Sequence, residues 1–209
     1  MLFWFIIIII LPVAVRVWYD LNYSRLKGRS GERFISGKLS QLDPNRYKVL
    51  NDILLPSRGN SVTTQIDHVV VSNYGIFCIE TKDYNGWIFG DAKQEYWTRV
   101  IYRYKDRIRN PMWQNYGHVK AIQDLVQSIN PNILIISFVA FPSTEKLKVS
   151  GTDCVGSGKD LIDKIQSYKR EVITDIKRDK IFTILESANI KDEEVRKQHI
   201  RNIRALKNN

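Results

Sequence analysis

The chain has 209 residues, of which 44% are hydrophobic and 26% are charged, a balance that excludes an intrinsically disordered protein and fits one ordinary domain with an appendage. A formal net charge of +10 indicates a polyanionic partner, either nucleic acid or an anionic membrane surface, without deciding between the two. Two cysteines, Cys78 and Cys154, are too few for a disulfide framework and favour a reducing compartment.

The first segment of the chain, Met1–Val15, contains no charged side chain. It approaches the roughly 20 residues of a membrane-spanning helix if Arg16 snorkels and Trp18 lies in the interface. A cleaved signal peptide and a buried soluble segment are the alternatives, and the lack of a basic start and of a small-residue cleavage site disfavours the signal peptide. Because basic residues follow, we expect residues 1–19 to be a single-pass transmembrane anchor with the C-terminal domain in the cytoplasm.

After the anchor the pattern alternates between helices and strands. Residues 20–30 are interpreted as a basic linker, followed by a helix at Gly31–Leu42 with apolar residues at helical spacing. The elements expected next, in chain order, are the strands Arg46–Leu55, Gln65–Ser72, Gly75–Lys82, Trp87–Gly90 and Tyr96–Tyr104, the helix Met112–Ile129, the strands Asn132–Phe141 and Val149–Val155, and the helices Gly158–Tyr168, Thr174–Ser187 and Lys191–Lys207. This order predicts an α/β fold with a mixed central sheet of about four or five strands and flanking helices.

The main candidate site lies in the two strands between residues 65 and 82. Asn73-Tyr74-Gly75 is a turn signal between two apolar runs and predicts an antiparallel hairpin. Because side chains alternate along a strand, Glu80 and Lys82 share one face, and the hairpin can bring Asp67 onto it. Two carboxylates and an ammonium at a strand end can hold a divalent cation beside the water that it activates. Solvated salt bridges are the competing interpretation, which the adjacent apolar runs disfavour.

A second candidate is the stretch from Tyr96 to Arg109, where aromatic and basic side chains interleave. Such a stretch can grip phosphates and stack on bases, so we expect it to contact nucleic acid. A solvated strand face and an anionic membrane surface remain open alternatives. The residues assigned to nucleic-acid binding are Arg99, Arg103, Arg107 and Arg109.

Many separate pieces of the chain follow one another in a recognisable order: Gly31-Glu32, Tyr47–Asp52, Gln65–Val71, Gly75-Ile76-Phe77, Glu80-Thr81-Lys82, Gly86–Gly90, Trp97 and Asn110–Asn115. Together these pieces resemble the nuclease-related domain (NERD) family, which is similar to the PD-(D/E)xK nuclease superfamily. The resemblance covers roughly residues 30–130. It departs from the superfamily at Ile66, where those nucleases have a Pro that takes no part in the chemistry.

The resemblance implies a restriction-endonuclease-like core and a role for each matching residue. Asp67 and Glu80 would bind the metal ion, Mg²⁺ or Mn²⁺. Lys82, Gln114 and Glu32 would be catalytic: the Lys acting on water and phosphate, the Gln positioning water or phosphate, and Glu32 giving a further ligand directly or through water.

The sequence therefore predicts a membrane-anchored, nuclease-like protein that hydrolyses phosphodiester bonds with a metal ion. DNA is the expected substrate, with RNA left open. The alternative is a non-catalytic, membrane-tethered module that binds nucleic acid or protein on a nuclease-like scaffold. In this interpretation residues 31–155 form the nuclease-related domain, and residues 156–209 form a C-terminal helical extension.

Overall fold

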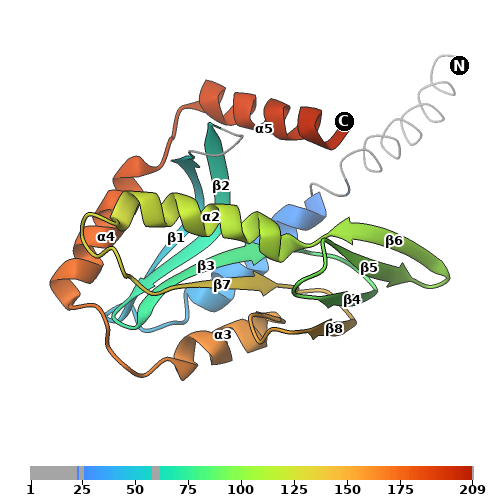
Figure 1. Ribbon diagram of the computed structural model, residues 1–209, viewed down its shortest axis with the longest axis horizontal. Coiled ribbons are helices and arrows are strands. Elements are labelled where there is room, and N and C mark those ends of the chain that lie inside the picture. Colours follow the sequence, from blue (N-terminus) through green and yellow to red (C-terminus); the bar gives the residue numbers. More distant parts are fainter. Residues whose placement is uncertain (1–22, 24–25, 58–61, 209) are drawn as a thin grey trace, which may run out of the picture.

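A computed structural model of the protein describes residue 23 and residues 26–57 and 62–208 (Figure 1). The predicted transmembrane anchor, residues 1–19, lies outside this part of the chain. Among the described residues, no helix combines the length and the apolar character needed to cross a membrane.

The centre of the fold is a five-stranded mixed sheet in the order β1-β2-β3-β7-β9. Strands β1, β2 and β3 pair antiparallel, whereas β3, β7 and β9 pair parallel, so the predicted mixed sheet is confirmed. The central strand β3 is buried along its whole length, as its continuous apolar run requires. The bounds of the five strands are Tyr47–Pro56 (β1), Thr63–Ser72 (β2), Gly75–Thr81 (β3), Ile135–Ala140 (β7) and Val155–Gly156 (β9).

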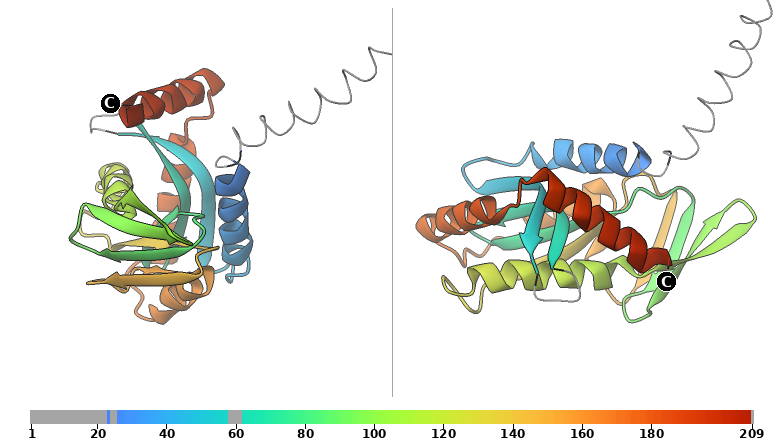
Figure 2. Two further views of the ribbon diagram at one scale, coloured as in Figure 1. Left: turned by 90° about the vertical axis from the view of Figure 1, so that its right-hand side faces the viewer. Right: turned by 90° about the horizontal axis from the view of Figure 1, so that it is seen from above.

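Helices cover both faces of this sheet (Figure 2). The first helix, residues 26–39, and α3, Gly158–Ser167, bury one core against Phe77 and Ile79 of β3. Helices α2, Pro111–Val126, and α4, Asp175–Ala188, bury the other core against Ile76 and Cys78. Even-numbered residues of β3 therefore face α2. The predicted α/β class with flanking helices is confirmed.

The first helix begins earlier than the sequence predicts, whereas the last three helices form within two residues of their predicted bounds. The first helix already includes residues 26–30, part of the stretch expected as a linker. Residues 156–209, expected as a helical extension, contribute α3 and α4 to the two cores of the central sheet. The final helix, α5, spans Glu193–Asn208.

A second sheet of four strands, in the order β6-β5-β4-β8, was not anticipated from the sequence. Its strands are Tyr104–Arg109 (β6), Tyr96–Ile101 (β5), Trp87–Asp91 (β4) and Lys146–Ser150 (β8). The prediction of one strand over Tyr96–Tyr104 is wrong, because the chain reverses at Tyr102-Arg103 and forms the β5–β6 hairpin. This hairpin projects away from the central sheet (Figure 1).

The predicted strand Val149–Val155 is also wrong, since the chain there passes from one sheet to the other. Strand β8 ends at Ser150, and Gly151 turns the chain with a φ of +76°. Strand β9 then begins at Val155 in the central sheet. Next, Ser157 caps α3, with its side chain and that of Asp160 bonding each other's backbone N–H groups.

Candidate active site

The candidate site lies where β2 and β3 meet beneath the first turns of α2. His68 of β2 pairs with Ile79 of β3. In the same antiparallel register, the preceding residue of β2, Asp67, lies opposite the next residue of β3, Glu80. The Thr81 backbone N–H donates to Asp67 Oδ2 over 2.7 Å and holds the two strands together at this point. Asp67 and Glu80 therefore lie on one face of the sheet, toward α2, as the sequence pattern predicts.

Glu80 is bonded through both of its carboxylate oxygens, and only 2% of the residue is exposed. Its Oε1 lies 2.5 Å from Lys82 Nζ and accepts from Gln114 Nε2 over 2.8 Å. Its Oε2 lies 3.1 Å from His118 Nε2. Lys82 Nζ in turn donates to Gln114 Oε1 over 2.9 Å, which closes a ring of three side chains.

These partners decide how Glu80 and Lys82 are charged. Burial alone raises the pKa of Glu80, but the Lys82 charge and the His118 hydrogen bond outweigh it and hold the pKa at about 2. Burial likewise lowers the pKa of Lys82, and the adjacent Glu80 carboxylate more than reverses this and raises it. The two residues thus form an ion pair at neutral pH, with Glu80 buried and Lys82 partly exposed.

For Asp67 and Glu32, favourable interactions only partly offset the effect of burial on the pKa. Burial, followed by the charge of Glu80, raises the pKa of Asp67 well above its ordinary value, and the Thr81 N–H bond only partly opposes this. Burial, together with the charges of Asp52 and Glu80, also raises the pKa of Glu32. The fold therefore disfavours the ionised form of both carboxyls, and a bound cation would favour it.

His118 is a site residue that sequence reasoning missed. It lies one helical turn after Gln114 on α2, so both side chains point to the same place. Its Nδ1 lies 2.7 Å from Thr64 Oγ1 while its Nε2 contacts Glu80, so β2 and β3 together fix the ring. The four-residue spacing from Gln114 is the signal that could have identified it.

Asn115 fixes α2 to the sheet beside the site. It is fully buried, and its amide donates to the carbonyl oxygens of Cys78 and Phe138 and to Ser137 Oγ. Its Oδ1 accepts from Cys78 Sγ. Because Asn115 directly follows Gln114, this clamp sets how far the Gln114 side chain stands from Glu80.

The four arginines expected at a nucleic-acid surface separate into two groups. Arg107 and Arg109 lie on one face of β6, and Arg103 occupies the hairpin turn. Arg99 lies on the other face of the hairpin, where it pairs with Asp106 at 2.5 Å and covers the Tyr84 ring. Arg99 is thus held within the second sheet, apart from the other three.

The donors of the site suit a hard divalent cation with several bound waters. Asp67 and Glu80 offer carboxylate oxygens. Mg²⁺ in proteins is commonly bound by one or two carboxylates and keeps water in its remaining coordination positions. Within the described ranges, no three His, Cys, Asp or Glu side chains converge to hold a metal ion. A cation here would therefore rest on these two carboxylates and would share Glu80 with Lys82 and Gln114.

Comparison with known proteins identifies the family. The sequence model of the nuclease-related domain family matches residues 27–142, which are more than half of the chain. A protein of Bacillus anthracis, described only as uncharacterised, is 36% identical over 176 residues, which are 84% of this chain and 82% of that protein. No solved structure matches. The chain belongs to the nuclease-related domain family, a nuclease-like class of protein.

Proposed function

We propose that the protein is a metal-dependent nuclease that hydrolyses phosphodiester bonds of DNA, on a core like that of restriction endonucleases. The observation that carries this proposal is the convergence of Asp67, Glu80, Lys82 and Gln114, where burial and the Glu80 charge disfavour the ionised form of Asp67. A bound Mg²⁺ or Mn²⁺ would polarise the phosphate and activate a water molecule.

The protein side chains would position the reacting groups around that ion. Asp67 and Glu80 would hold it through their carboxylates. Lys82, already cationic and 20% exposed, would lie beside the phosphate and offset the charge that develops on it. Gln114 would orient water or a phosphate oxygen through its amide. Glu32, a partly buried carboxyl within electrostatic reach of Glu80 and Lys82, would hold a metal-bound water.

The second candidate, a non-catalytic binding module on the same scaffold, is favoured by one observation. Both oxygens of Glu80 already have partners in Lys82, Gln114 and His118. Because these side chains already bind the Glu80 oxygens, the site can keep its shape without a metal ion, as a non-catalytic module would require.

A nuclease assay with calorimetry separates the two candidates. The full chain is tested with Mg²⁺ or Mn²⁺ on supercoiled, linear and single-stranded DNA, with EDTA as the blank. Asp67→Asn should lose both metal binding and cleavage, whereas Lys82→Met should bind metal and lose cleavage. Glu186→Gln, which changes an exposed carboxylate on α4, is the matched control. Absence of metal binding in the unaltered protein would favour the module.

We also propose that residues 1–19 anchor the protein in a membrane with the nuclease domain on the cytoplasmic side. The uncharged run Met1–Val15 and the basic residues after it support this. Deleting residues 1–20 should move the protein from the membrane fraction to the supernatant after lysis without detergent. Recovery of the full chain in the supernatant would refute the anchor.

A further inference from the structure

The β5–β6 hairpin carries large, solvent-exposed aromatic side chains at its tip. Tyr102 is 96% exposed and Tyr104 is 79% exposed. Tyr102 also has a φ of 51°, a left-handed conformation that Asn or Gly adopts far more readily than a bulky residue. A folding requirement would select a smaller residue at this turn, so the ring at position 102 points to a role in binding.

One face of β6 presents a row of cations. Because side chains alternate along a strand, Lys105, Arg107 and Arg109 share this face, and all three are exposed. Successive members of the row are about 7 Å apart along the strand. Asp106, the acid within β6, lies on the opposite face, where Arg99 binds it. The exposed face thus offers positive charge alone along a strand that ends its sheet.

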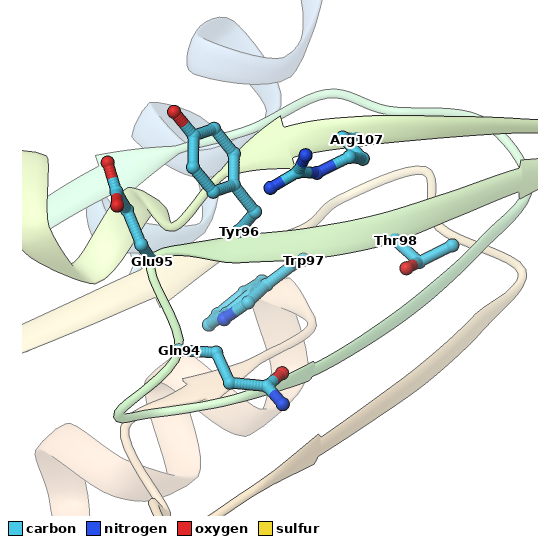
Figure 3. A pocket seen from close by; sticks show the side chains of 6 residues that line it. All are labelled: Gln94, Glu95, Tyr96, Trp97, Thr98 and Arg107. Carbon is cyan, nitrogen blue, oxygen red and sulfur yellow. The ribbon is translucent and has the colours of Figure 1, made fainter.

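At the base of the hairpin the cations and the aromatic rings come together. The Arg107 guanidinium lies 4.3 Å from the centre of the Tyr96 ring, and Tyr96 remains 43% exposed. Figure 3 shows these two side chains at a hollow whose lining residues are Gln94, Glu95, Tyr96, Trp97, Thr98 and Arg107. A planar ring with a guanidinium over it is a surface on which a nucleic-acid base and its phosphate can both be bound.

The hairpin is also fixed in position relative to the candidate active site. Asn110 follows β6 directly, and its backbone N–H donates to Glu95 O over 2.8 Å. Its side chain donates to Ala92 O and Gln94 O and accepts from the Met112 N–H at the start of α2. The same α2 carries Gln114 one turn later. A chain lying along the hairpin is therefore directed toward Glu80 and Gln114.

We propose that the β5–β6 hairpin is a stacking arm for single-stranded nucleic acid, which it delivers to the candidate active site. The inference rests on the proposed function in one respect, because it takes the candidate active site to be the place where the bound strand is cleaved. Tyr96 shares the face of the cationic row, Tyr104 lies on the opposite face with Asp106, and Tyr102 occupies the turn between them. Single strands are favoured over duplexes because their unpaired bases can reach and stack on rings on either side of the end strand. The cationic row of β6 would run beside the phosphates.

The test measures binding in EDTA, so that cleavage does not intervene. Fluorescence anisotropy of a labelled single strand, and of a duplex of the same sequence, is followed with the full chain in a fixed concentration of neutral detergent. Tyr102→Asn with Tyr104→Thr removes both rings and keeps residues suited to a turn and a strand. Ile176→Asn removes an apolar side chain on α4 that is 83% exposed and serves as the control.

The double variant should bind the single strand about tenfold more weakly and change duplex binding by less than about twofold. Lys105→Ala with Arg107→Ala should instead weaken both complexes and reduce the salt dependence of both. An equal loss on both nucleic acids, or no loss, overturns the proposal. So does unchanged single-strand binding together with weaker binding to mixed micelles of the same detergent and phosphatidylglycerol, which would assign the hairpin to a lipid surface.

Failure of this inference is distinguishable from failure of the proposed function. If ring removal leaves single-strand binding intact while the unaltered protein cleaves DNA with Mg²⁺, the arm is wrong and the nuclease stands. If ring removal abolishes single-strand binding while no metal supports cleavage, the arm stands and the nuclease is wrong.

Discussion

The two carboxylates of the candidate site should respond in opposite directions to removal of their charge. Glu80 has its pKa lowered from an ordinary 4.5 to about 2, which corresponds to about 3 kcal/mol of stabilisation at neutral pH, since each pKa unit is worth about 1.4 kcal/mol. Glu80→Gln should therefore lower the free energy of unfolding of the metal-free protein by about that amount. For a chain of this length, this corresponds to a fall in melting temperature of roughly 6–12 °C.

Asp67→Asn should raise the melting temperature instead. The pKa of Asp67 is raised, first by burial and then by Glu80, so this carboxyl destabilises the fold at neutral pH. The amide of Asn can still accept the Thr81 N–H that Asp67 now binds.

Both changes in the free energy of unfolding should depend on pH, and urea unfolding in the presence of EDTA measures this dependence. The destabilisation by Glu80→Gln should shrink as the pH falls from 4.5 toward about 2, because the unaltered protein loses the Glu80 contribution over that interval. The gain from Asp67→Asn should be present at neutral pH and vanish below 3.8, where this carboxyl is protonated in folded and unfolded chains alike. A stabilising Glu80→Gln, or a destabilising Asp67→Asn, would refute this account of the site.

Three further substitutions test the packing around the site, each by thermal melting of the metal-free protein. Asn115→Ala removes four hydrogen bonds of a buried side chain and should cost about 3 kcal/mol; a loss below about 1 kcal/mol would mean that water replaces the amide. Ser157→Ala removes the cap of α3 and should cost about 1 kcal/mol, with Ser167→Ala at the far end as control. Gly90→Ala drives a methyl group into Trp97 and should cost about 2 kcal/mol, and a neutral result would show that the indole can move.

The central hairpin could be predicted because local signals and burial agree there. The apolar runs, the Asn73-Tyr74-Gly75 turn and the two-residue period together fix which side chains share a face. Asp67, Glu80 and Lys82 therefore converge as the pattern requires. Gln114 reaches them from a separate helix, and only the family resemblance pointed to it.

The features that the sequence did not reveal depend on tertiary contacts or lack local turn residues. His118 joins the site through Thr64 and Glu80, which are distant in sequence. The β5–β6 reversal uses Tyr102-Arg103, and neither residue type marks a turn. Because all arginines carry the same charge, the sequence could not distinguish Arg99, which pairs with Asp106, from the exposed Arg107. Sequence alone treats Asp67 and Glu80 alike, whereas their partners give them opposite pKa shifts.

The position of β6 at the end of its sheet has a consequence for how the protein behaves in concentrated solution. An end strand with unpaired backbone groups can recruit the strand of another molecule and start aggregation. Charged side chains on such a strand oppose this, and β6 carries Lys105, Asp106, Arg107 and Arg109. The same charges would thus keep the protein monodisperse, and replacing them with apolar residues should promote self-association. Variants made to probe binding are therefore best compared at low protein concentration, with light scattering alongside.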